Sequence, residues 1–126
     1  MARTNPGFER ITIALAGVLG GGGVMAAAGA AHGGAGSNLG SIAMVCLAHG
    51  PALLALGLAG PRGRLFAAAA ILLGLGTLVF AGDLLARQYL GRAAFPLAAP
   101  LGGMGMIAGW IAVIAAGLWS QSQAAQ

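Results

Sequence analysis

Residues 11–31 read ITIALAGVLGGGGVMAAAGAA, a stretch of 21 residues without a charged side chain. A helix needs about 20 predominantly apolar residues to cross the roughly 30 Å of hydrocarbon in a bilayer. The stretch also has features of a signal peptide, because a basic segment precedes it and small residues end it. Its apolar part is longer than the ~7–15 residues usual for a signal core, which favours a retained transmembrane helix.

Three more apolar runs follow, separated by short connections. The four runs predict helices over about residues 11–31, 41–60, 65–89 and 96–119. Pro51 interrupts the second run, where a proline removes a backbone donor and favours a kink. Pro96 and Pro100 stand at the start of the fourth run, where proline suits the first helical turn. Short connections make successive helices antiparallel. The chain is therefore predicted to be one all-α domain, residues 1–126, in an up-down-up-down membrane bundle.

The composition agrees with a protein that lies in a membrane. Hydrophobic residues make up 59% of the chain and charged residues 6%, whereas a soluble domain has about 25% charged residues. The net charge of +4 raises the alternative of nucleic-acid binding, which requires a clustered basic surface. Here the arginines stand between the apolar runs. We therefore expect contact with the lipid bilayer and none with nucleic acid.

The arginines also predict the orientation of the bundle. One side of the membrane would receive four of them and the other side two: Arg3, Arg10, Arg62 and Arg64 against Arg87 and Arg92. Cytoplasmic segments of membrane proteins carry an excess of arginine and lysine. Both termini are therefore expected in the cytoplasm.

Small residues spaced four apart recur in three of the predicted helices. Lipid tails are as apolar as leucine, so membrane helices associate by close backbone packing, which small residues allow. The predicted packing positions are Gly17 with Gly21, Ala70 with Gly74, and Gly105 with Gly109. Each pair faces either the bundle interior or another subunit, and the pattern alone leaves both alternatives open.

His49 is predicted to lie roughly 16 Å deep in the membrane, counted at 1.5 Å per helical residue. A neutral histidine bonded to a backbone carbonyl freed by Pro51 is one interpretation. The other is a functional group, since ionisable residues at such depth are costly, with a single-histidine haem or chlorin ligand as a special case. His32 ends the first helix, and the two depths differ by roughly 14 Å, which opposes a haem shared by both histidines.

Asp83 and Arg87 are four residues apart in the favourable order for an ion pair on a helix. A local salt bridge is the simpler interpretation, and a proton or ion relay with a neighbouring helix is the alternative. Cys46 and His49 share a helix face, but two ligands do not make a zinc site, so no metal is expected. The sequence has no carboxylate pair, nucleophile–base set or phosphate-binding loop, and we expect no enzyme.

Five segments carry recognisable motifs, in order: AGAAH at 28–32, HGPALL at 49–54, LVFAGDL at 78–84, APLGG at 99–103 and AGW at 108–110. They resemble, respectively, the GAFGAH, H-x-LA-L, LFSGSLY, TP-x-GG and AGW motifs of the YgdD-like family. These are small four-helix proteins of bacterial inner membranes, with mitochondrial relatives and no established function. The resemblance implies a multi-pass protein of the bacterial inner membrane. The resemblance implies no particular reaction, because none is established for the family. Asp83 stands where the family usually has serine.

Three hypotheses for function follow. The first is a non-enzymatic structural or accessory subunit that packs through glycine-rich helix faces, in a larger membrane complex or a homo-oligomer. The second is a small transporter or proton-translocating module that uses His49 and Asp83. The third is a membrane protein that binds haem or a chlorin through His49.

Overall fold

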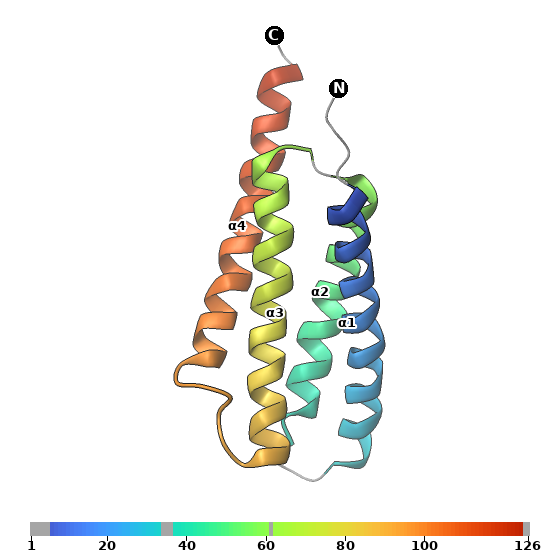
Figure 1. Ribbon diagram of the computed structural model, residues 1–126, viewed down its shortest axis with the longest axis vertical. Helices are drawn as coiled ribbons and strands as arrows, with labels where there is room; N and C mark the ends of the chain where they lie inside the picture. Colours follow the sequence, from blue (N-terminus) through green and yellow to red (C-terminus); the bar gives the residue numbers. More distant parts are fainter. Residues whose placement is uncertain (1–5, 34–36, 61, 125–126) are drawn as a thin grey trace.

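The computed structural model describes residues 6–33, 37–60 and 62–124, with side chains up to Trp119. Four helices make up the fold: α1 Pro6–His32, α2 Leu39–Ala59, α3 Arg64–Leu90 and α4 Ala98–Ala124. All four are long and apolar enough to cross a membrane. They alternate in direction, so the start of α1 and the end of α4 lie at the same end of the bundle (Figure 1). The predicted all-α, up-down membrane bundle is confirmed.

The helix ends differ from the predicted bounds by a few residues. α1 begins at Pro6, five residues before the uncharged run, because proline at the first helical position loses no hydrogen bond. α4 begins at Ala98, so Pro100 lies in its first turn and Pro96 precedes it. α2 continues through Pro51 from Leu39 to Ala59.

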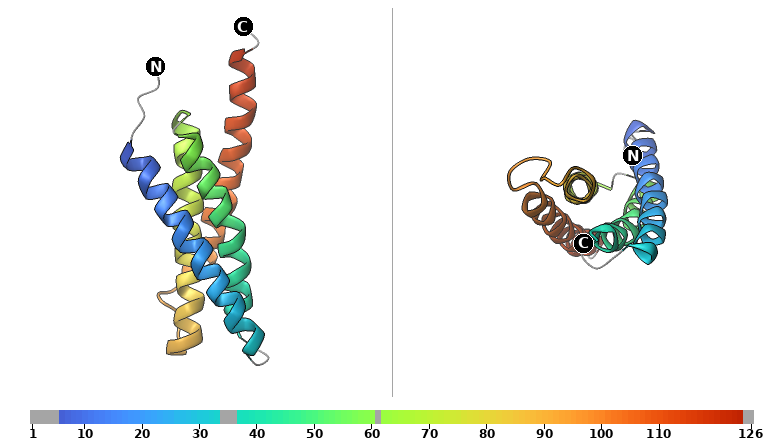
Figure 2. Two further views of the ribbon diagram at one scale, coloured as in Figure 1. Left: turned by 90° about the vertical axis from the view of Figure 1, so that its right-hand side faces the viewer. Right: turned by 90° about the horizontal axis from the view of Figure 1, so that it is seen from below.

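The four helices are arranged as two antiparallel hairpins. α1 packs along α2, and α3 packs along α4, while α2 and α3 join the two hairpins. α1 meets α3 only over a short stretch, and within the described residues α1 and α4 do not pack together. Seen along the bundle axis in Figure 2, α1 and α4 lie on opposite sides, with α2 and α3 between them. The arrangement leaves much of α1 and α4 facing lipid.

Glycines set the spacing inside each hairpin. A Cβ atom added to Gly50 of α2 would lie 3.2 Å from the backbone nitrogen of Gly20 in α1. A Cβ atom on Gly76 of α3 would lie 2.7 Å from the backbone nitrogen of Met106 in α4, and one on Gly102 would lie 2.6 Å from that of Phe80. The distances at Gly76 and Gly102 exclude a side chain unless α3 and α4 separate, and the distance at Gly50 requires a small shift of α1 against α2.

Four of the six predicted packing residues lie inside the bundle. Ala70 is buried. Added Cβ atoms at Gly74, Gly105 and Gly109 would meet atoms of neighbouring helices at 2.9, 3.3 and 2.7 Å. In contrast, Gly17 and Gly21 are exposed, and an added Cβ atom would meet nothing within 4 Å. Within this chain they are not packing residues, because α1 turns Gly20 and Gly23 toward α2 instead. Their packing against another subunit stays a prediction.

Candidate functional site

The deepest polar side chain of α2, His49, is buried and forms two hydrogen bonds. Its Nδ1 lies 2.8 Å from the carbonyl oxygen of Val45. Its Nε2 lies 3.1 Å from Nε1 of Trp110, which comes from α4. A carbonyl only accepts and an indole N–H only donates. The bonding pattern therefore defines a neutral imidazole with its proton on Nδ1, and the Trp110 indole donates to Nε2.

The predicted partner of His49 was wrong in one respect. Pro51 removes the donor that would bond the carbonyl four residues earlier, which belongs to Leu47. His49 bonds Val45 instead, because a helical side chain lies over the preceding turn and reaches the carbonyl four residues before its own position. The structural interpretation of a neutral, hydrogen-bonded histidine nevertheless describes the observed geometry.

His49 does not fit the donor set of a haem or chlorin site. Axial ligation needs a ring nitrogen with an available lone pair, and the Nε2 lone pair accepts the Trp110 hydrogen bond. His32 offers no second ligand nearby, because it is the exposed last residue of α1 and bonds the carbonyl of Ala28 at 2.9 Å. Among the described residues, no three histidine, cysteine or carboxylate side chains gather as they would around a metal ion.

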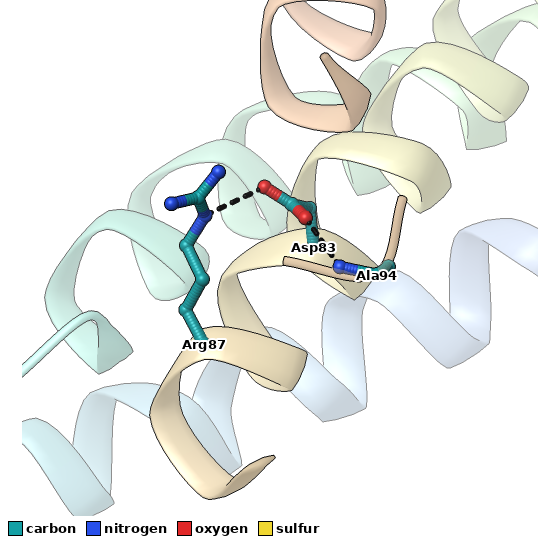
Figure 3. Close-up of polar contacts among 3 residues, drawn as sticks. All are labelled: Asp83, Arg87 and Ala94. Atoms are coloured by element: carbon teal, nitrogen blue, oxygen red, sulfur yellow. Dashed lines mark hydrogen bonds and ion pairs between the residues drawn. The ribbon is translucent and has the colours of Figure 1, made fainter. Parts of the chain in front are cut away.

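Asp83 lies in the last turns of α3, and its side chain is fully buried. Figure 3 shows its carboxylate between two donors. Oδ2 accepts from Nε of Arg87 at 2.8 Å, and Oδ1 accepts from the backbone N–H of Ala94 at 2.7 Å. The local ion pair predicted from the sequence is present. The bond to Ala94 adds a second role, since it ties the α3–α4 connection back onto α3.

A further polar contact that the sequence did not indicate joins the two hairpins. The side-chain Oε1 of Gln88 in α3 accepts a hydrogen bond from the backbone N–H of Asn38 at 2.8 Å. Asn38 precedes the first residue of α2, where backbone N–H groups have no partner within the helix. Gln88 therefore acts as an external cap for α2. The two residues are 50 positions apart, and no local pattern connects them.

An apolar groove opens between α1 and α3, with α2 at its floor. We call it the α1–α3 groove. Its volume is about 250 Å³. At one end of the groove, Leu15 of α1 packs over Gly74 of α3. A Cβ atom added to Gly74 would lie 2.9 Å from Leu15 Cδ2. Leu53 of α2 contributes to the floor, and the walls include Phe8, Ile11, Thr12, Leu15, Ile71 and Leu75.

Of the buried polar side chains, His49 bonds a second helix and Asp83 bonds the α3–α4 connection. Thr12 and Thr77 bond carbonyl groups of their own helices. Every buried side-chain nitrogen or oxygen in the described part of the chain has a hydrogen-bond partner. No hydrogen bond joins His49 to Asp83: each has its own separate partners. The arrangement is suited to fixing helix positions, and the α1–α3 groove lies apart from these polar contacts.

A protein-family model described as "Protein of unknown function (DUF423)" matches residues 25–103. The matched segment runs from the last turns of α1 through α2 and α3 to the first turns of α4. It includes His32, His49 and Asp83. Neither the curated proteins nor the solved structures gave a significant match.

Proposed function

Because the chain belongs to the DUF423 family of YgdD-like small membrane proteins, whose description names no reaction, we propose its function from the structure. The protein is a non-enzymatic accessory subunit of the membrane. It associates through the outer face of α1, either with a second copy or within a larger membrane complex.

The outer face of α1 carries this proposal. Gly17 and Gly21 are exposed there, with open space around the position of a Cβ atom. Ala14, one turn before Gly17, lies on the same face and is also exposed. The row of small residues ends at Met25, one turn after Gly21. Small residues in such a row let two helix backbones approach closely in lipid. The other helix-contacting glycines lie against neighbouring helices of the same chain, whereas this row has no partner among the described residues.

The satisfied polar groups support a packing role over chemistry. A proton-translocating module would need His49 and Asp83 to exchange protons. Both are held by hydrogen bonds, His49 to Trp110 and Asp83 to Ala94.

The transport alternative is tested by flux in proteoliposomes: it requires that replacing both residues abolishes flux while the bundle stays folded. The cofactor alternative requires a visible absorption band in the purified protein.

The test of the proposal changes the exposed glycines. Gly17→Ile with Gly21→Ile is expected to abolish association, measured by single-molecule photobleaching in native-membrane nanodiscs and by blue-native electrophoresis. Branched side chains on this face keep two helices apart. The matched control is Gly22→Ile with Gly103→Ile. Both positions also have open space but lie off the small-residue face. A wild-type protein that is monomeric and without neighbours would refute the proposal, as would equal effects of the two pairs.

A further inference from the structure

The α1–α3 groove faces the lipid and has a cation on the same helix face at its open end. Arg64 is the first residue of α3 and stands seven residues before the groove residue Ile71. Seven residues are about two turns, so Arg64 lies on the groove face, about 10 Å toward the membrane surface. Arg64 is exposed. It forms no ion pair or side-chain hydrogen bond with any described residue.

The start of α3 adds a second feature that favours an anion. Its N-cap residue is Gly63, which lacks a side chain and provides no side-chain cap. The first N–H groups of a helix have no partner within the helix, and the helix dipole favours negative charge there. The uncapped N–H groups and Arg64 therefore lie together at the start of α3, about two turns from the groove residue Ile71.

The charges around this end of the bundle have an excess of positive sign. Arg10 and Arg62 are exposed at the same end. Glu9 is the one carboxylate described at this end, and its Oε1 lies 3.1 Å from where a Cβ atom on Gly60 would be. It therefore lies against the end of α2. An anion approaching Arg64 meets a net positive field, and the cytoplasmic leaflet, where this end is expected, supplies anionic lipids.

We propose that the α1–α3 groove is a binding site for one anionic phospholipid. One acyl chain lies along Phe8, Ile11 and Ile71, and the phosphate is bound by Arg64 and the N-terminus of α3. The apolar walls fit a hydrocarbon chain and not a free phosphate ion. An α-helix with side chains is about 10 Å across, too wide for a groove of about 250 Å³, which argues against a helix of a second copy.

Binding is tested by native mass spectrometry of the full chain in detergent, titrated with phosphatidylglycerol or phosphatidylcholine. We expect phosphatidylglycerol to bind about fivefold more tightly, the factor that one arginine near a membrane surface contributes. Arg64→Gln should remove this preference, while Arg62→Gln should change it by less than about twofold. Equal affinities for the two lipids, or equal effects of the two substitutions, would overturn the proposal in favour of non-specific lipid contact.

The groove itself is tested by filling it. Ile71 is 51% exposed, so Ile71→Trp is tolerated by the fold and places an indole in the groove. It should weaken the binding of both lipids at least fivefold. Ile107→Trp, at a position on α4 that is 63% exposed, is the matched control and should leave both unchanged. No loss of binding with Ile71→Trp would contradict the proposed location.

The location is also mapped directly with a photoreactive phosphatidylglycerol carrying a diazirine on its acyl chain. In vesicles of phosphatidylcholine with about one-fifth of this lipid, labelling should concentrate on the segments 8–15 and 70–75. Labelling spread evenly over α4 and the outer face of α1 would overturn the proposal. So would a cross-link between two chains at Ile71, because it would put a second copy in the groove. The Gly17/Gly21 variant should keep the lipid, which separates this site from the proposed association face.

Discussion

At the scale of single residues, the hydrogen bond between Trp110 and His49 joins α4 to α2 across the bundle. Trp110→Phe should destabilise the protein because it leaves the buried Nε2 without a donor. Double-mutant cycles on polar contacts in membrane bundles give about 0.6 kcal/mol on average and at most about 1.7. We expect a coupling of about 1 kcal/mol between Trp110→Phe and His49→Phe, measured by denaturant unfolding in mixed micelles.

Trp119→Phe is the control for this cycle. Trp119 is 67% exposed, and the indole that bonds His49 is that of Trp110, so the substitution of Trp119 should be nearly neutral and additive with His49→Phe. Additive effects of Trp110→Phe and His49→Phe would contradict the predicted coupling and would leave His49 available for another role.

The buried carboxylate of Asp83 makes a second prediction at this scale. Asp83→Leu removes the acceptor of the Ala94 N–H. Hydrogen exchange at this amide should therefore become about tenfold faster or more, the factor expected for one lost hydrogen bond. Arg87→Gln removes the ion pair but leaves the acceptor, so it should change the exchange rate much less. Equal acceleration by the two variants would show that the ion pair, rather than the bond to Ala94, holds the connection.

These residues also show how far the sequence alone could reach. The Asp83–Arg87 pair was predictable because residues four apart on one helix are neighbours, whatever the packing of that helix. The bond from Ala94 to Asp83 crosses a turn, and the bond from Trp110 to His49 spans 61 positions. Such pairings depend on how the helices are rotated and tilted against each other, and a uniformly apolar helix carries little pattern that specifies its rotation.

At the scale of helices, the α3–α4 contact depends on the absence of side chains at the crossing. Gly76→Leu should destabilise the protein by about 1–3 kcal/mol, the usual cost of an overpacked core, because its Cβ atom would meet the backbone of Met106 at 2.7 Å. Unfolding free energy in mixed micelles measures the effect. Gly82→Leu, on the same helix with open space around it, is the control. Equal stability of the two variants would contradict the tight crossing.

The helix faces illustrate a limit of pattern-based prediction. The sequence correctly identified the four helices and several buried small positions such as Gly105 and Gly109. It missed Gly76 and Gly50, where an added Cβ atom would meet the backbone of the neighbouring helix at 2.7 and 3.2 Å, and it selected Gly17 and Gly21, which lie outside. A four-residue spacing of small residues identifies a face along which a helix is able to pack. The partner of that face depends on the tilt of the neighbouring helix, and the spacing of small residues does not encode this tilt.

At the scale of the whole molecule, the arginine distribution predicts that the end with both termini faces the cytoplasm. In a Cys46→Ala background, Ala93→Cys should react with a membrane-impermeant maleimide in intact spheroplasts. Gly7→Cys, near the start of α1, should react only after lysis. The first position lies in the α3–α4 connection, at the opposite end from the start of α1 (Figure 1). The reverse labelling pattern would invert the proposed orientation and would place Arg64 in the other leaflet.

The helix that each helix contacts most is its neighbour in the sequence, α1 with α2 and α3 with α4. Contacts between α1 and α2, and between α3 and α4, are therefore able to form during synthesis, before the rest of the chain is made. The short connection within each hairpin keeps the entropic cost of loop closure low. The α2–α3 interface, the Gln88–Asn38 cap and the Trp110–His49 bond then join two preassembled halves. We therefore expect the bundle to assemble by insertion of two hairpins followed by lateral docking in the bilayer, and expect the halves 1–60 and 61–126 to complement each other when they are expressed as separate fragments.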